Sequence, residues 1–542
     1  MIFKQLLQES KISFRKIIGL GIISAVASCV MLAILNNATS EVKVGEANYQ
    51  GFLLFMIALV LSVLTKKVSL DRTQNIVQGV LRGIRIRIAD KIRKSSLVSF
   101  ETRGKEIYYV ALTQQTSFIS NSSMTLINAS QSLVIIFACI FYIGWISPVS
   151  LLLILVFVAA GILLYQLKEG EFQSKIIKAT QKESRFFALL NHILDGFKEL
   201  NLSNRKSDAV FREFNTISDQ ATALKVATGA KLTETIMFSQ AYMYILIAAL
   251  IVVFPFFELT PYSEIPKLIV AVLFFWSSLE SVVAAIPDFA KASTAMAQLS
   301  QLEQELEHVE DLIAPKSQTT QDPFTFRAEL ALNQLVYRHQ GKDDEVVFQV
   351  GPVDAKVKKG EILFICGGNG SGKTSLIKAL SSLYPPSSGE LTLDGHEISK
   401  EERFHYRQLF SVVYSDFHLF DKLYGLRDID HKRVNGLLDQ LGLSSKTAFT
   451  GNAFTNLNLS HGQRKRLAIV VSLLEERPIY LFDEPAAELD PEFRKYFYET
   501  FLPELRDEGK TIVVITHDDR YFSCCDRILK MDSGLIVEEK QL

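Results

Sequence analysis

The segment Gly367-Gly368-Asn369-Gly370-Ser371-Gly372-Lys373-Thr374 fits the pattern G-x-x-x-x-G-K-[ST]. An apolar run, residues 361–366, precedes it, and a run with helical spacing begins at Ser375. Glycines let successive backbone N–H groups surround phosphate oxygens, and the following helix adds the positive end of its dipole. This strand, loop and helix predict a nucleotide-phosphate site made by Gly367, Gly368, Asn369, Gly370, Ser371, Gly372, Lys373, Thr374 and Ser375.

Two side chains of this loop are expected to act on the phosphates. Lys373 can reach the outer phosphates, and the Thr374 hydroxyl can ligate Mg²⁺. A glycine-rich turn can also arise by chance, but the flanking strand and helix are the context in which the pattern has its chemical meaning.

The composition indicates a membrane protein with more than one domain. The chain has 542 residues, of which 48% are hydrophobic, and its mean hydropathy is +0.18. The formal net charge is −1, so nothing in the overall charge favours a nucleic-acid partner.

Six predominantly apolar stretches lie in the first 300 residues. Each has about the 20 residues that a membrane-spanning helix needs. We therefore predict an all-α transmembrane domain over residues 1–312, with spans at residues 17–35, 47–65, 124–146, 149–167, 236–257 and 268–287. Ser147-Pro148 separates the third span from the fourth, because proline does not continue a helix without losing a hydrogen bond.

Lysine and arginine are concentrated in residues 66–105 and 168–231, which places these segments in the cytoplasm. Both have helical periodicity, so the membrane helices are expected to continue into the cytoplasm and to turn around near residues 99–105 and 201–208. Residues 313–325 form a predicted linker. Residues 326–542 form a predicted α/β domain that contains the glycine loop.

Three further motifs in this domain fit nucleotide hydrolysis. An apolar strand ends in Asp483 and Glu484, where Asp483 can hold Mg²⁺ and Glu484 can polarise an attacking water as general base. His517 ends another apolar strand and can contact a terminal phosphate. An acidic pair can be plain surface charge and a single histidine is often structural, so the assignment depends on their order and spacing. The predicted catalytic residues are Glu484, His517 and Lys373, and the predicted metal ligands are Thr374 and Asp483.

A second anion site is predicted at Leu459-Ser460-His461-Gly462-Gln463, before a helical run. With the preceding motifs, this segment resembles the ATP-binding cassette (ABC) family, whose signature is L-S-G-G-Q, and here His461 replaces a glycine. Ala487-Glu488-Leu489-Asp490 resembles the loop that follows the acidic pair in that family. The resemblance covers the whole chain and implies an exporter half-transporter, with six spans and then one nucleotide-binding domain.

The resemblance also implies partners. In the family, ATP is sandwiched between the glycine loop of one nucleotide-binding domain and the signature of another, so a homodimer is expected, in contact with membrane lipids. Leu459, Ser460, Gly462 and Gln463 would then bind the nucleotide held by the second copy. The cytoplasmic turnarounds would correspond to coupling helices.

Several segments resemble one branch of the family, the bacterial exporters of cyclic peptides and siderophores. They are Val350-Gly351-Pro352-Val353-Asp354, residues 410–420, residues 515–522 and Asp195-Gly196-Phe197-Lys198-Glu199-Leu200. The branch implies export of a peptide-like small molecule across the bacterial inner membrane, with the nucleotide-binding domain in the cytoplasm. A lipid or drug exporter, or a membrane-anchored regulatory ATPase, is the alternative.

Two positions depart from the family pattern. Ser415 stands where a glutamine near Mg²⁺ is usual, and its shorter side chain would reach the metal only through water. The aromatic residue that stacks on adenine aligns with His339, and Tyr337 is the alternative. Within the last span, Glu280 is either a cargo or coupling residue or a plain helix contact, because a carboxylate in lipid needs a cavity or a partner.

Overall fold

The computed structural model describes residues 13–40, 49–257, 262–307, 324–340, 346–426, 429–487 and 489–542. Most of the predicted linker and Glu488 lie outside the described residues. The chain divides into two compact units, Met1–Arg85 with Ala111–Ser300 (unit 1) and Ile86–Val110 with Gln301–Leu542 (unit 2). The segment Ile86–Val110, from the first predicted cytoplasmic turnaround, therefore belongs by its contacts to unit 2.

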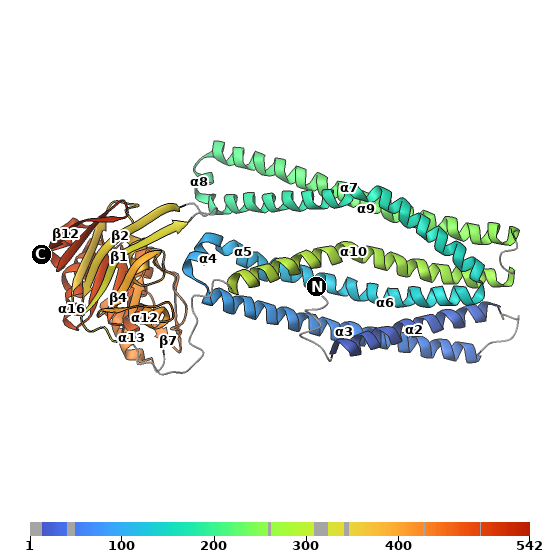
Figure 1. The fold of residues 1–542 in the computed structure, drawn as a ribbon, viewed down its shortest axis with the longest axis horizontal. Coiled ribbons are helices and arrows are strands. Elements are labelled where there is room, and N and C mark those ends of the chain that lie inside the picture. The colour runs from blue at the N-terminus through green and yellow to red at the C-terminus, as the bar shows by residue number, and fades with distance from the viewer. Residues whose placement is uncertain are drawn as a thin grey trace. The chain divides into compact units, whose positions relative to one another are not determined.

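Unit 1 is helical. Its elements are α2 (Ser13–Ser40), most of α3 (Tyr49–Lys94), η1 (Ala111–Gln115), α6 (Thr116–Ile146), α7 (Pro148–Asp195), α8 (Phe197–Asn201), α9 (Asn204–Phe256), η2 (Tyr262–Glu264) and most of α10 (Ile265–Glu307). Helices α7 and α9 lie side by side over much of their length (Figure 1).

Four helical stretches among the described residues are long and apolar enough to cross a membrane: Tyr49–Lys94, Lys105–Ile146, Asn204–Phe256 and Ile265–Glu307. Two shorter apolar helices of 10–17 residues, Gly19–Ile34 and Pro148–Gly161, fall in the first and fourth predicted spans. A membrane-spanning helical domain ahead of an α/β domain is thus confirmed, and the number of six spans stays a prediction.

The helix breaks follow local chemistry. Ser147 accepts a hydrogen bond from the Ser150 N–H at 3.2 Å and starts α7, with Pro148 in its first turn, where a missing N–H costs nothing. The second turnaround begins earlier than predicted. Helix α7 ends at Asp195, and α9 starts at Asn204 behind the capping Ser203. The turn therefore occupies residues 196–203 and not 201–208, because Gly196 ends α7 before residue 201 is reached.

Unit 1 packs around apolar side chains from several helices. Its buried centre includes Leu32, Ile143, Leu246, Leu268 and Phe275. A buried amide ties three helices together, because the Asn36 Nδ2 donates to the Tyr142 hydroxyl and to the Lys267 carbonyl, each at 3.1 Å. Such polar contacts hold helices together where lipid supplies no hydrophobic drive.

Unit 2 contains two main sheets (Figure 1). A four-stranded antiparallel sheet has the order β2-β1-β4-β5, and a six-stranded sheet has the order β12-β11-β3-β10-β9-β6. In the second sheet only β12 runs antiparallel to its neighbour. The strands are β1 (Glu329–Gln340), β2 (Val346–Lys358), β3 (Ile362–Gly367), β4 (Ser388–Leu393), β5 (His396–Glu397), β6 (Phe410–Val413), β7 (Phe449–Thr450), β8 (Ala453–Phe454), β9 (Ile479–Asp483), β10 (Thr511–Ile515), β11 (Arg527–Asp532) and β12 (Leu535–Gln541).

Unit 2 also contains helices. They are α11 (Lys373–Leu380), α12 (Arg403–Arg407), α13 (His431–Gln440), α14 (His461–Leu474), α15 (Pro491–Tyr496), η3 (Phe497–Phe501), α16 (Leu502–Asp507) and η4 (Asp519–Cys524), and α4 (Leu97–Arg103) and α5 (Lys105–Val110) also belong to unit 2. Every residue of β9 and β10 is buried, as expected for parallel strands covered on both faces. Alternate residues of β3 enter two separate cores: Phe364 enters one and Ile365 the other.

Candidate functional site

The site lies at the carboxyl edge of three neighbouring parallel strands. Ile515 of β10 is paired with Ile365 of β3 on one side and with Asp483 of β9 on the other. The residues that follow these positions therefore meet at one edge, which is where open α/β sheets place ligands. They are the glycine loop, Glu484 and His517.

Glycine is required at two positions of the loop. Gly367 has φ +147°, and a Cβ there would lie 2.2 Å from the Met531 carbonyl oxygen. Gly372 has φ +97° and stands at the N-terminus of α11, where a Cβ would lie 3.0 Å from Val350 Cγ2. Only glycine combines such backbone angles with such close neighbours. The predicted turn between β3 and α11 is thus present.

Lys373 is buried at the start of α11. Its Nζ donates to the carbonyls of Gly367 at 3.1 Å and Gly368 at 2.9 Å, and 6% of the residue is exposed. Burial lowers the pKa of Lys373, and the carboxylates of Glu484 and Asp483 oppose that shift. The ammonium is held by neutral oxygens of its own loop. Anionic phosphate oxygens would be stronger acceptors for the same group.

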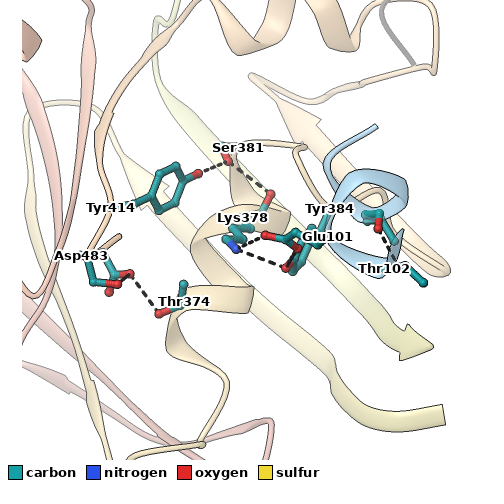
Figure 2. Close-up of polar contacts among 10 residues, drawn as sticks. Glu101, Thr102, Thr374, Lys378, Ser381, Tyr384, Tyr414 and Asp483 are labelled. Carbon is teal, nitrogen blue, oxygen red and sulfur yellow. Dashed lines mark hydrogen bonds and ion pairs between the residues drawn. The ribbon is translucent and has the colours of Figure 1, made fainter. Parts of the chain in front are cut away.

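The two predicted metal ligands touch each other. The Thr374 hydroxyl donates to Asp483 Oδ2 at 3.0 Å, as Figure 2 shows, and the Ser415 hydroxyl reaches the same oxygen at 3.3 Å. The other oxygen, Asp483 Oδ1, is buried with no hydrogen-bond partner among the described residues. Burial raises the pKa of Asp483, and the hydrogen bond from Thr374 opposes it.

This donor set fits Mg²⁺, which prefers oxygen ligands and keeps waters and phosphates in its remaining positions. Within the described ranges there is no group of three or more His, Cys, Asp or Glu side chains placed to hold a metal. A Mg²⁺ ion held by Thr374 and Asp483 would keep its other positions for waters and phosphate oxygens. Ser415 lies beside these ligands, because its hydroxyl donates a hydrogen bond to the Asp483 carboxylate.

Glu484 has an unusual backbone. Its φ is +48°, a region that non-glycine residues seldom occupy. Its N–H donates to the Ile515 carbonyl at 3.1 Å, and its Oε1 lies 3.1 Å from His517 Nε2. About a third of the Glu484 side chain and two fifths of the His517 side chain are exposed, so both can reach a ligand at the edge.

Lys465 holds the backbone of Glu484 in place. The sequence analysis did not predict this role. Its ammonium donates to the Glu484 carbonyl, and 2% of the residue is exposed. A signal was present in the sequence, because Lys465 lies three and four residues before Ala468 and Ile469, on the buried face of α14. A buried cation in such a place needs an acceptor.

The predicted second anion site forms the start of α14. Ser460 caps the helix: its hydroxyl accepts from the Gln463 N–H at 3.4 Å, while Gln463 Oε1 accepts from the Ser460 N–H at 3.1 Å. Ser460 is exposed, and Leu459, Gly462 and Gln463 are half-buried. This capping box leaves the positive end of the helix at the surface.

Burial separates the two candidates for the adenine contact. Tyr337 is 3% exposed and stacks on Tyr384, with 4.4 Å between ring centroids and 16° between planes. His339 is half-buried, and its ring lies 6.5 Å from that of Tyr384. The surface position favours His339, and Tyr337 supports the tyrosine beside it.

Comparison with known proteins places the chain among transporters. A family model for ABC transporters matches residues 350–487. The ATP-binding protein SyrD of Pseudomonas syringae pv. syringae is 31% identical over 545 residues, which cover 96% of this chain and 93% of that protein. The glutamate/aspartate import ATP-binding protein GltL of Escherichia coli K12 is 34% identical over 201 residues, 34% of this chain and 81% of GltL.

A solved structure supports the same fold over both units. The structure of a bacterial Atm1-family ABC exporter with ATP bound matches with a TM-score of 0.77 at 16% identity, over 99% of this chain and 95% of that one. The site geometry, the apolar helices and the similarity along nearly the whole chain agree. The chain therefore belongs to the ABC transporter family, as a membrane-embedded half-transporter that binds ATP and couples ATPase activity to transport.

Proposed function

We propose that this ABC transporter is an ATP-driven exporter that works as a homodimer and moves a peptide-like small molecule, such as a cyclic peptide, lipopeptide or siderophore, across the bacterial inner membrane. The observation that carries the ATP-driven part is the edge where Thr374 meets Asp483 and Glu484 meets His517. Support for the cargo class comes from the segments that resemble the peptide and siderophore branch, among them Asp195-Gly196-Phe197 at the start of the second turnaround.

The proposed roles follow from the contacts. The loop N–H groups and Lys373 hold the phosphates, and the Thr374 hydroxyl and the Asp483 carboxylate hold Mg²⁺. When bound, Mg²⁺ would neutralise charge on the phosphate oxygens. Glu484 accepts a proton from the attacking water, and His517, 3.1 Å from its carboxylate, orients that base and contacts the terminal phosphate. His339 stacks on adenine.

A second copy completes each site. The chain holds one glycine loop and one signature segment, so two chains supply two of each. Leu459, Ser460, Gly462 and Gln463 of one copy would meet the phosphates bound by the other, through the exposed start of α14. ATP would then favour the closed dimer because it binds that state better than the open one.

The proposal also includes the number of membrane spans, the domain limits and the role of Glu280. We infer six spans, with domain limits at residues 1–312 and 326–542 and a linker at 313–325. Glu280 is half-buried in α10, and we assign it a cargo or coupling role. In proteoliposomes Glu280→Gln should alter cargo export or cargo-stimulated ATPase activity. Unaltered values for both would remove this assignment.

The direct test of the catalytic role is Glu484→Gln in the full-length protein, reconstituted in lipid. ATP binding should persist while turnover falls at least about 100-fold, because the amide cannot accept the proton. Turnover at the wild-type rate would show that Glu484 is not the base. The cargo is tested by comparing metabolites retained in cells with and without the protein. A trapped peptide or siderophore supports the proposal, and a trapped lipid or drug contradicts it.

A further inference from the structure

Helix α4 is docked within unit 2 by apolar and polar contacts. Ser96 caps its N-terminus, and Gly104, with φ +77°, ends it. Leu97 and Val98 pack against the core that contains Ile365. The helix follows directly after α3, which runs without interruption from Tyr49 to Lys94. A shift of α4 is therefore connected through the backbone to one of the long apolar helices.

The carboxylate of Glu101 on α4 uses both of its oxygens. Oε1 lies 2.8 Å from Lys378 Nζ, and Oε2 accepts a hydrogen bond from the Tyr384 hydroxyl at 2.5 Å. Lys378 Nζ also donates to the Tyr384 hydroxyl at 3.2 Å, so the three side chains close a triangle (Figure 2). The side chain of Lys378 is 12% exposed and that of Glu101 32% exposed, so solvent screens this pair less than a surface ion pair.

Each partner of Glu101 leads to a different part of the proposed ATP site. Lys378 lies on α11, the helix of eight residues that begins with Lys373 and Thr374. Tyr384 stacks on Tyr337, whose strand also carries His339 two residues later. Burial raises the pKa of Tyr384, and the Glu101 carboxylate adds to the shift, so the hydroxyl remains a donor.

The far end of α4 is held separately. Arg103 Nη1 lies 2.8 Å from Glu305 Oε2 near the end of α10, and Arg87 lies 3.1 Å from Glu303 on the same helix. One helix, α4, thus makes two kinds of attachment: Glu101 bonds the glycine-loop helix α11, and Arg103 bonds α10.

Helix α11 also lies close to the segment that carries Ser415. The hydroxyl of Ser381, directly after α11, lies 3.4 Å from the hydroxyl of Tyr414, the neighbour of Ser415.

We propose that Glu101 is the positioning residue through which ATP occupancy is passed to α4, because it bonds both the helix that bears Lys373 and Thr374 and the tyrosine pair beside His339. This inference rests on the proposed ATP site. Binding of phosphates and adenine would move the two partners of Glu101 together, and α4 would follow them. By thermodynamic linkage, α4 would in turn bias the affinity for ATP.

The test uses the full-length protein in lipid nanodiscs, with Glu484→Gln as background so that bound ATP is not consumed. Hydrogen exchange at residues 97–103 is followed by mass spectrometry with and without Mg-ATP, and ATP binding is measured in parallel. In the background protein, ATP should change exchange in α4. With Glu101→Gln or Glu101→Ala, ATP should still bind, and the change in α4 should shrink at least about fivefold.

Thr102→Ala is the matched control, since its hydroxyl donates only within α4, to the Val98 carbonyl at 2.8 Å. It should keep the full ATP response. The pair Glu101→Lys with Lys378→Glu should restore the response that Glu101→Lys alone removes. An ATP response in α4 that survives Glu101→Ala overturns the inference, as does a background protein that binds ATP without any response in α4. A background protein that binds no ATP contradicts the proposed ATP site instead.

Discussion

The two halves of the proposed ATP site differ in how their polar atoms are satisfied. At the glycine-loop edge, Asp483 Oδ1 and the Ser371 hydroxyl are buried without a hydrogen-bond partner among the described residues. At the start of α14, Ser460 and Gln463 satisfy each other. Buried polar atoms without partners are rare in proteins unless a ligand, ion or water supplies the partner. The glycine-loop half therefore has buried polar atoms that a ligand could bond. The α14 half presents a capped helix N-terminus at the surface.

The loss of Lys373, in the glycine-loop half, should lower turnover more than any of the changes that follow. Lys373→Ala removes the cation that the loop holds on two of its own carbonyls. Turnover should fall at least about 100-fold, as for other groups that stabilise developing charge, and ATP affinity should fall with it. ATPase assays and equilibrium binding measure both. Near-normal turnover would show that the buried lysine has only a structural role.

Removal of the metal that Thr374 and Asp483 are proposed to hold should have the next largest effect on turnover. With EDTA the wild-type protein should lose turnover, because Thr374 and Asp483 would have no cation to hold. Asp483→Asn should raise the Mg²⁺ concentration needed for half-maximal turnover by about 10- to 100-fold. A titration of Mg²⁺ at saturating ATP measures this. An unchanged requirement would show that the orphaned carboxylate oxygen does not face the metal.

A smaller effect is expected from Lys465, which connects α14 to Glu484. Lys465→Met should lower turnover about tenfold with little change in ATP affinity, because the carbonyl of Glu484 loses its donor and the base loses its position. Arg464→Met is the matched control at the preceding position of α14, where the guanidinium of Arg464 lies over the ring of Phe417. Equal losses for the two variants would show that the contact to Glu484 does not matter.

The smallest effect is expected at Asp490, which caps α15 and pairs with Arg466 of α14. The Phe493 N–H bond and then the charge of Arg466 hold the pKa of Asp490 below its usual value. Asp490→Ala should cost about 1 kcal/mol of stability near neutral pH. Since the folded pKa is lowered, this difference is full above the unfolded pKa of about 3.9 and is lost as the pH falls through the folded value.

Thermal unfolding of the full chain at several pH values measures that difference. The gap between wild type and Asp490→Ala should stay constant from about pH 8 to 5 and narrow below about pH 4. A gap that widens on acidification would contradict the assigned role of the carboxylate. The Asp490 side chain is half exposed, so its ion pair with Arg466 should contribute less than the cap.

Local patterns were enough to predict the glycine loop, the strands that end at Asp483 and near His517, and the break at Ser147-Pro148. Each depends on neighbours in sequence, such as the turn that Gly367 and Gly372 allow. The pairing of Glu101 with Lys378 and Tyr384 was not predictable, because it joins residues 277 and 283 positions apart. The choice between His339 and Tyr337 likewise required knowing which side chain is buried. Tyr337 is buried against Tyr384, a residue far from it in sequence, so the pattern of the strand alone could not decide.

The central claim is that each ATP site combines the glycine loop of one copy with the signature of another. It is tested with a purified heterodimer in which one chain carries Lys373→Ala and the other carries Ser460→Arg. If sites form between chains, one site keeps both halves intact, and turnover should exceed that of either mutant homodimer. A second heterodimer, with both changes in one chain and none in the other, should then be inactive. The reverse result, with activity only in the second heterodimer, would show that each site forms within one chain.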